Sequence, residues 1–455
     1  MNVDLSGLRQ ASPRGTDVDS IRRQVESLAD PYDIERWVIP LPLWARRDYD
    51  NDGPAAWEIL RADLHRAAES RPLCIYLHVP FCSRKCGFCD CYSFRLSPGH
   101  EEEKARYVRR LCSELDLWSA QGNLAERPIS TVHLGGGTPT FLGPELLAQL
   151  TDACRSGFNV TEDTEWALES TVEGLSTEML DTMQRCGFTR LHVGVQSLED
   201  PVRKAIGRRN SSSEVLGRLR QARDLGWIVS ADVVCGLPFQ TITSFAADVE
   251  ILIEEGMNGV SLYELLIYRQ NRLWAERMGL GNRSHVPNYL MFQVAAELLE
   301  RHGYLKNTFN HWADDRDDNR YFTFPTRGED CLAIGAIADG ALGDYHFRHP
   351  RYGPYIRSAS DSPGLEGGLR RTAGESELHC VTTALMAGHI PKELVPCLLR
   401  EGDGPTLRQR WIDAGLVCET DDGGLSLLTN GSWFAGNMVQ ELTTSRTALE
   451  IAEWG

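Results

Sequence analysis

The chain has 455 residues, 42% of them hydrophobic, so it is too long for one small domain and can bury a large core. Its formal net charge of −17 disfavours nucleic acid and anionic membrane surfaces as partners, and no stretch reaches the roughly 18 apolar residues of a membrane span. The polar start lacks the apolar core of a signal peptide, and 13 scattered cysteines indicate reduced thiols rather than a disulfide framework. We therefore expect a cytoplasmic monomer that binds neither nucleic acid nor a membrane.

Residues 1–70 are predicted to form an N-terminal arm that precedes the first convincing strand. Residues 17–29 are predicted to be helical, and residues 30–52 form an irregular segment rich in Pro, Trp, Tyr and Arg. Helical spacing over 57–69 then leads into a strand.

Strands and helices alternate from residue 73 onward. Such alternation implies parallel strands covered by helices, and six units of this kind predict a partial (β/α)6 TIM-like barrel within residues 71–375. In barrels of parallel strands the chemistry lies at the C-terminal ends of the strands. The predicted strands cover 74–79, 131–134, 166–170, 191–195, 229–233 and 259–263.

The segment from 271 to 375 is less regular and is predicted to extend the barrel. It holds a helix over 287–302, a strand over 304–308 and an apolar, glycine-rich run at 331–343. The acidic stretch Asp314–Asp318 is interpreted as a solvated turn.

Residues 376–455 are predicted to form a small C-terminal domain that is rich in helix and resembles a winged helix. A helix over 406–414 precedes two short strands, at 415–419 and 425–428, which flank an Asp-Asp-Gly-Gly turn. That turn is a strong hairpin signal. A final helix is expected over 430–442.

The loop after the first strand carries Cys82, Cys86 and Cys89 in the spacing C-x3-C-x2-C, with a fourth thiol at Cys91. Three thiolates on one tight loop can face one soft metal centre and leave one coordination position open, as in a [4Fe–4S] cluster with three protein ligands. A zinc site stays open as an alternative, although zinc prefers two C-x2-C pairs or added histidines, and no second pair follows.

This loop, with Phe88 just before its last cysteine, resembles the radical S-adenosylmethionine (SAM) superfamily. Tyr76 and His78 narrow the resemblance to the subfamily of oxygen-independent coproporphyrinogen III oxidase. The resemblance implies that the three cysteines of the C-x3-C-x2-C spacing hold a [4Fe–4S] cluster, whose open iron is chelated by the amino and carboxylate groups of SAM. It also implies that Tyr76 and Phe88 belong to the cofactor site.

Gly136, Gly137 and Thr138 belong to a Gly-Gly-Gly-Thr-Pro turn after the second strand, where glycines let the backbone approach a ligand closely. The turn is neither a Walker loop nor a dinucleotide fingerprint. By resemblance it contacts the amino group of SAM, and Glu169, which closes the third strand, contacts the first SAM.

Three further residues match those that bind a second SAM in the subfamily, namely Gln196, Arg208 and Asp232. A buried aspartate must find a hydrogen-bond donor or shift its pKa, and a ribose hydroxyl would satisfy Asp232. The resemblance implies catalytic roles for Tyr76, Glu169 and Gln196.

Two segments depart from the subfamily. Glu35–Tyr49 replaces the Tyr-Thr-Ser-Tyr-Pro-Thr type segment that closes on a porphyrinogen, and Asp318–Phe322 lacks the histidine and tryptophan of the haem-chaperone motif. These departures, together with Asn430–Phe434, favour a resemblance to class C radical SAM methylases and cyclopropanases.

That resemblance implies an enzyme that uses two SAM molecules to methylate or cyclopropanate an sp2 carbon of a small secondary metabolite. A radical made from the first SAM would take hydrogen from the methyl group of the second. The expected partners are the small-molecule substrate and an external electron donor such as flavodoxin or ferredoxin. Two alternatives stay open: an oxygen-independent, decarboxylating coproporphyrinogen III oxidase, and a haem-binding chaperone of the same family.

Overall fold

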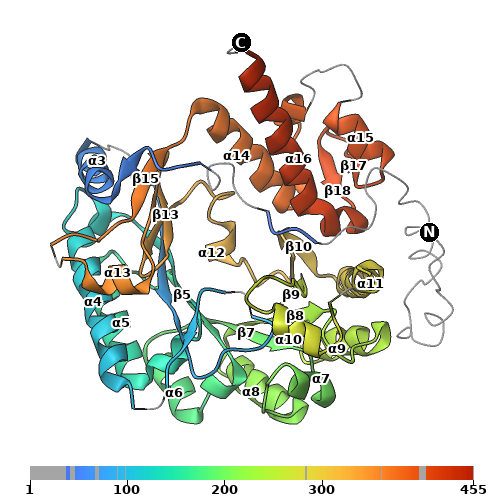
Figure 1. Ribbon diagram of the computed structural model, residues 1–455, viewed down its shortest axis with the longest axis horizontal. Coiled ribbons are helices and arrows are strands. Elements are labelled where there is room, and N and C mark those ends of the chain that lie inside the picture. The colour runs from blue at the N-terminus through green and yellow to red at the C-terminus, as the bar shows by residue number, and fades with distance from the viewer. Residues whose placement is uncertain are drawn as a thin grey trace.

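The structure is a computed structural model that describes residues 37–40, 47–66, 71–89, 91–97, 99–281, 284–359, 361–398 and 406–453 (Figure 1). Within these ranges most strands belong to one 13-stranded sheet, and two small sheets complete the set. No helix in the described part of the chain is both long and apolar enough to cross a membrane. The predicted helix over 17–29 lies outside the described residues.

Six consecutive parallel strands form the predicted partial barrel, which the structure confirms. They are neighbours in chain order, and their buried β-branched and leucine residues explain why they form a central sheet. They are β2 (Leu73–Val79), β5 (Ile129–Gly136), β6 (Glu165–Ser170), β7 (Arg190–Gln196), β8 (Ile228–Cys235) and β9 (Gly259–Glu264).

Helices that connect these strands cover the outside of the barrel (Figure 1). Their starts are encoded locally: Ser211 and Glu214 form a capping box, and Ser176 caps another helix through the backbone N–H of Met179. Gly226, at φ 84°, ends the capping-box helix in the left-handed conformation. These helices are α4 (Glu101–Ser119), α5 (Pro144–Gly157), α6 (Thr177–Arg185), α7 (Asp200–Ala205), α8 (Ser212–Asp224) and α9 (Ile242–Glu254).

The glycine-rich run at 331–343, predicted as less regular, extends the sheet on the far side of β2. Strand β12 (Asp330–Ile334) pairs in parallel with β2 from Leu73 to Leu77, so the strand that carries the cysteine loop has a neighbour on both edges. The sheet continues antiparallel through β13 (Asp339–Leu342), β14 (Tyr345–Arg348), β15 (Gly367–Arg370) and β1 (Asn51–Asp52). Helix α3 (Gly53–Arg66) follows β1, and at the other edge β11 (His311–Ala313) pairs antiparallel with β9 and then β10 (Leu305–Thr308).

The C-terminal part combines helices with a three-stranded antiparallel sheet, as the winged-helix-like pattern predicted. The predicted domain limits stay predictions. The elements are α14 (Ala373–Met386), β16 (His389–Ile390), α15 (Leu407–Asp413), β17 (Val417–Glu419), β18 (Leu425–Leu427) and α16 (Thr429–Glu453), while α11 (Val286–Arg301) packs between α9 and α16.

One described piece of the arm, residues 37–40, packs between the barrel and α16. Trp37 is buried, stacks on Phe309 with ring centroids 4.6 Å apart, and donates its backbone N–H to Glu264 Oε2 at 2.7 Å. A Cβ on Gly436 of α16 would lie 1.8 Å from the carbonyl oxygen of Val38, so this helix position must be glycine for the arm to pack.

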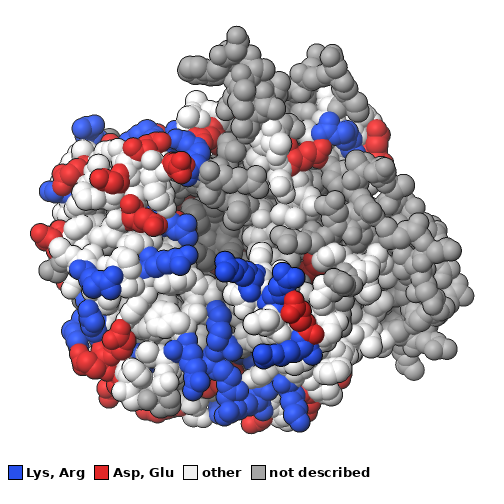
Figure 2. Space-filling view, in the orientation of Figure 1, with Lys and Arg blue, Asp and Glu red and all other residues white. Residues whose placement is uncertain are grey.

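Positive charge gathers on one face despite the net charge of −17. Figure 2 shows Lys and Arg side chains around the lower centre of that face, over α7, α8 and α10 (Arg272–Arg277).

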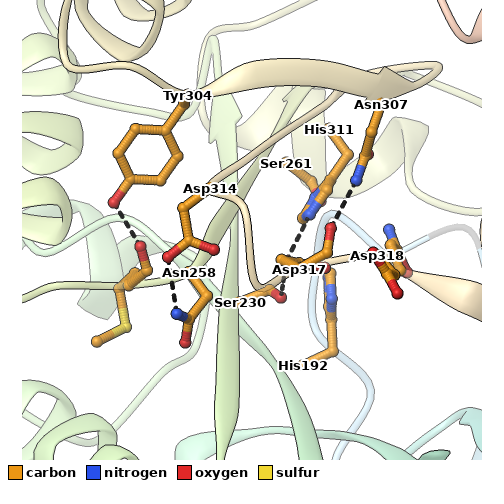
Figure 3. Close-up of polar contacts among 12 residues, drawn as sticks. His192, Ser230, Asn258, Ser261, Tyr304, Asn307, His311, Asp314, Asp317 and Asp318 are labelled. Atoms are coloured by element: carbon orange, nitrogen blue, oxygen red, sulfur yellow. Dashed lines mark hydrogen bonds and ion pairs between the residues drawn. The ribbon is translucent and has the colours of Figure 1, made fainter.

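The acidic stretch Asp314–Asp318 is only partly a solvated turn, because Asp317 is buried (Figure 3). Its carboxylate pairs with the buried Arg190 and accepts hydrogen bonds from Ser230 Oγ at 2.8 Å and His311 Nε2 at 3.0 Å. Burial alone would raise the pKa of Asp317, but Arg190 holds it well below its usual range. This network joins β7, β8 and β11 inside the barrel.

We expect Gly436→Ala to destabilise the fold by about 1–3 kcal/mol, because the new methyl group must displace backbone. Gly217→Ala is the matched control: Gly217 lies in α8 with nothing near its missing Cβ, so alanine should raise stability by about 0.5–1 kcal/mol. Urea unfolding of both variants measures the difference, and equal effects would contradict the packing of the arm.

We expect Asp317→Asn to lower the free energy of unfolding by about 3–5 kcal/mol, because it leaves the buried Arg190 charge without its counter-ion. Asp318→Asn is the control, since Asp318 is exposed and its pair with Arg320 is 3.8 Å long. Since the folded pKa of Asp317 is depressed, its contribution is present above the unfolded carboxyl pKa and disappears as the pH falls through the folded one. A wild-type loss of stability on acidification that persists unchanged in Asp317→Asn would contradict this assignment.

Candidate active site

A cavity of about 200 Å³ lies at the C-terminal ends of the barrel strands, where the cysteine loop meets β5 to β8. We call it the strand-end cavity. It brings together residues that the sequence spreads over 150 positions, as the alternation of strands predicted. The predicted site residues on its wall are Cys82, Cys86, Phe88, Cys89, Gly136, Gly137, Thr138, Glu169, Gln196, Arg208 and Asp232.

The cysteine loop is tied down at both ends. Strand β3 (Phe81–Cys82) pairs with β4 (Phe94–Arg95), and the Cys89 N–H donates to the Cys86 carbonyl at 3.2 Å. Lys85 Nζ donates to the Cys91 carbonyl at 2.6 Å, and Phe88 packs against a small apolar cluster with Trp274. The loop therefore presents its thiols to the cavity from a fixed frame.

The donor set fits a [4Fe–4S] cluster. Cys82, Cys86 and Cys89 face a shared cavity that has room for a group larger than an ion, and three protein thiolates leave one iron open. Within the described ranges, no group of three or more His, Cys, Asp or Glu side chains is close enough to hold one metal ion. Burial raises the pKa of the Cys86 thiol and Arg208 opposes that rise, so Arg208 favours the thiolate that a metal would bind.

The glycine turn packs directly against the cysteine loop. Gly137 N–H donates to the Val79 carbonyl at 2.7 Å, and a Cβ on Gly137 would lie 2.6 Å from the Phe81 carbonyl oxygen. Gly136 has φ 106°, and a Cβ there would lie 2.5 Å from the His78 ring. Only glycine allows this approach, and the turn exposes backbone to the cavity as a result.

Two carboxylate–imidazole pairs lie at the floor of the cavity, where Glu169, His192 and Asp232 belong to the lining and His133 does not. Glu169 Oε1 lies 3.0 Å from His133 Nε2, and Asp232 Oδ1 lies 2.5 Å from His192 Nε2. Because Glu169 faces His192 in the ladder between β6 and β7, the four side chains alternate across β5 to β8. Both imidazoles are at least nine-tenths buried, and the Nδ1 atom of each has no hydrogen-bond partner.

This alternation sets the protonation states. Burial alone would raise the pKa of Glu169, but His133, His192 and the Gly136 N–H lower it overall. Burial alone would lower the pKa of His192, but the Asp232 carboxylate raises it. The floor therefore keeps an ionised carboxylate beside an imidazole that holds its proton to higher pH than usual.

Sequence analysis missed His133 and His192. A single histidine within an apolar strand belongs to no motif, and its carboxylate partner lies on the next strand, 36 or 40 residues away. The signal in the sequence was their position near the end of a strand: His133 lies two residues before Gly135, and His192 lies two residues before Gly194.

The side chains of Gln196 and Arg208 approach each other over Gly194 of β7, which has no side chain. A Cβ on Gly194 would lie 2.7 Å from Gln196 Nε2 and 3.4 Å from Arg208 Nη2, so the missing side chain makes room for both. Gln196 has φ 71°, a conformation that costs a non-glycine residue about 1–3 kcal/mol and is typical of functional sites. Arg208 pairs with Glu173 at 3.3 Å, and its Nε is buried without a partner.

Tyr76, predicted as a cofactor contact, does not line the strand-end cavity. Its hydroxyl bonds to His78 Nδ1 at 2.9 Å, and its ring stacks on Tyr321 at 4.8 Å. Tyr321 in turn stacks on His133 at 4.2 Å. Tyr76 therefore lies outside the cavity lining, in a stack with Tyr321 and His133, and its catalytic role stays a prediction.

Comparisons with known proteins place the chain. The model of the radical SAM superfamily matches residues 76–252. An anaerobilin synthase of Escherichia coli O157:H7 is 27% identical over 390 residues, covering 83% of this chain and 85% of that protein. An oxygen-independent coproporphyrinogen III oxidase of Salmonella typhimurium is 31% identical over 62% of this chain, which spans 64% of that protein. The heme chaperone HemW of Mycobacterium tuberculosis is 31% identical over 62% of this chain and 73% of that protein.

The solved structure of coproporphyrinogen III oxidase from Escherichia coli supports the fold. It superposes with a TM-score of 0.74 over 90% of this chain and all of that chain, at 21% identity.

The predicted methylation or cyclopropanation of a secondary metabolite is wrong. The relatives are named for anaerobilin, coproporphyrinogen III and heme, which agrees better with the alternatives. That prediction depended on the residue types at Glu35–Tyr49, Asp318–Phe322 and Asn430–Phe434, which carry none of the cluster or SAM motifs. The chain belongs to the radical SAM superfamily, in the group of oxygen-independent coproporphyrinogen III oxidase and its relatives, a membership that implies a [4Fe–4S] cluster and SAM.

Proposed function

We propose that this protein is a radical SAM enzyme that transforms a tetrapyrrole bound next to the strand-end cavity. One observation carries the proposal: a single cavity joins the three thiols of the cysteine loop to the alternating floor of Glu169, His192 and Asp232. The substrate class is supported by relatives named for tetrapyrroles, of which the anaerobilin synthase aligns with most of this chain.

Different residues of the cavity wall would hold the cluster and SAM. Cys82, Cys86 and Cys89 would hold the cluster, which together with SAM supplies a carbon radical that takes hydrogen from an unactivated position. Glu169, kept ionised by its two imidazoles, would accept hydrogen bonds from SAM. The enclosing strand ends orient the bound groups and exclude water.

A second SAM is part of this proposal. Gln196 at the end of β7, Arg208 in the turn after α7 and Asp232 on β8 form a second set on the wall of the same cavity. Arg208 has an unpartnered buried Nε to offer. Arg208 would bind a carboxylate and Asp232 a hydroxyl.

The external electron donor is proposed to dock on the basic rim of the cavity. We define this rim as Arg84, Lys85, Lys204, Arg209 and Arg272, which are exposed on the cysteine loop, α7, the turn after it and α10. Arg84 Nη1 donates to the Gly207 carbonyl at 3.0 Å, which joins the cysteine loop to the turn after α7. A positive rim on a chain of net charge −17 favours an acidic partner.

The function is tested by anaerobic incubation of the cluster-loaded protein with SAM, a reductant and either haem or coproporphyrinogen III. We expect tetrapyrrole consumption coupled to SAM cleavage. Changing Cys82, Cys86 and Cys89 together to Ala should abolish both, whereas Cys91→Ala should retain them because Cys91 lies outside the three-ligand spacing. Haem bound without any SAM cleavage would favour a haem chaperone, the class of the HemW relative, and activity in the triple variant would refute the cluster assignment.

Arg208→Ala tests the second cofactor set. We expect tetrapyrrole modification to fall at least tenfold further than SAM cleavage measured without substrate. Arg220→Ala is the control, because Arg220 pairs with Glu255 on the outside of the barrel. An equal loss of both activities would assign Arg208 to the fold or to the first SAM instead.

Charge reversal on the rim tests the donor. Lys204→Glu combined with Arg209→Glu should slow reduction by flavodoxin severalfold at low ionic strength, with the difference shrinking as salt screens it. Reduction by dithionite should not change, and Arg66→Glu, at the exposed end of α3, should match the wild type. Unaltered flavodoxin kinetics in the double variant would remove the rim as the docking surface.

A further inference from the structure

A second cavity, of about 280 Å³, lies between the barrel and the C-terminal helices. It is bounded by the turn after β10, by α12 (Arg320–Thr323) and its following loop, and by α14 and α16, with α12 lying between barrel and C-terminal helices in Figure 1. We call it the apolar cavity. Its apolar wall includes Phe309, Phe322, Phe324, Pro325, Met386 and Val439, and Pro40 and Ala387 also belong to it.

One side chain separates the apolar cavity from the floor of the strand-end cavity. Phe322 lines the apolar cavity, and its ring lies edge-on to His133 at 5.9 Å and 6.4 Å from His192. A ligand seated in the apolar cavity therefore lies one aromatic ring away from the floor.

Phe322 is 41% exposed, although it also contacts the buried rings of His133 and His192. The single turn that carries it is fixed: Asn319 adopts the left-handed conformation at φ 45°, and the Thr323 hydroxyl donates to the Asn319 carbonyl at 3.1 Å. The backbone thus holds an exposed aromatic ring at the border, an arrangement that exposes apolar surface for a ligand to cover.

The lining carries no net charge near neutral pH. His379 is its one titratable side chain among the described residues, and burial lowers the pKa of His379 to about 4, so the imidazole is neutral. Hydroxyls of Thr382 and Thr383 and the Asn307 amide supply the polar part. Such a wall suits a flat aromatic ligand and disfavours a charged sulfonium or nucleotide.

We propose that the apolar cavity binds one edge of the tetrapyrrole macrocycle, with Phe322 packed against the ring at the border with the strand-end cavity. Its volume is at the small end of ligand pockets, so it would hold an edge while the rest of the ring faces the opening. This inference rests on the proposed function, and it adds a site where the substrate is held apart from SAM.

The test is a Soret-band titration of the cluster-loaded protein with metal-free protoporphyrin IX, which no thiol or imidazole can ligate through iron. Ala387→Phe places a ring in the cavity from the end of α14 and should raise the Kd at least tenfold, and Phe322→Leu should raise it severalfold. Ala373→Phe is the matched control, because it adds the same ring at an exposed position of the same helix and should leave the Kd within twofold of wild type.

The outcomes separate the site from the function. Wild-type affinity in both Ala387→Phe and Phe322→Leu would overturn the site while leaving tetrapyrrole chemistry intact. Absence of binding of both protoporphyrin IX and haem to the wild type would overturn the site together with the substrate class. Phe322→Leu guards against misfolding as an explanation, since an exposed side chain contributes little to the core.

Discussion

The packing of the glycine turn onto the cysteine loop is the contact on which the site depends. Backbone N–H groups of Gly137 and Thr138 donate to carbonyls of Val79 and Phe81, and Thr138 Oγ1 reaches Cys82 Sγ at 3.5 Å. A side chain at Gly136 would clash with the His78 ring, and one at Gly137 would clash with the Phe81 backbone. The register of β2 against β5 thereby fixes where the thiols lie relative to the floor, because the same ladder leads on to Glu169 and Asp232.

Local pattern was enough to predict the barrel and most of the cavity wall. Buried β-branched runs located six strands, and residues at strand ends converge in any parallel barrel, so eleven of the twelve predicted site residues share one cavity, with Tyr76 left outside it. Strand β12 was missed because its apolar run, Cys331–Ile334, has only four residues and shows no alternation, and its pairing with β2 makes it a strand.

Features that depend on distant partners could not be predicted. Asp317 belongs to an acidic stretch, and the sequence of such a stretch does not show which of its carboxylates are buried. Its partner Arg190 is 127 residues away in the chain. The alternating floor has the same origin, since His133 and His192 acquire meaning only from carboxylates on neighbouring strands. The predicted substrate class was wrong for a different reason: it was inferred from Glu35–Tyr49, Asp318–Phe322 and Asn430–Phe434, whose residue types do not by themselves identify a substrate.

The double-edged pairing of β2 has a consequence for how the protein survives loss of its metal. A strand bonded on both sides exchanges its amide hydrogens with solvent only when the whole barrel opens, whereas β3 and β4 are two residues long and can separate locally. The cysteine loop is thus attached to a strand that is paired on both edges, through the short β3–β4 pair that can separate and re-form. If oxygen destroyed the cluster, the barrel would stay folded. Rebuilding the cluster would then require only that β3 and β4 pair again, and not that the domain refold.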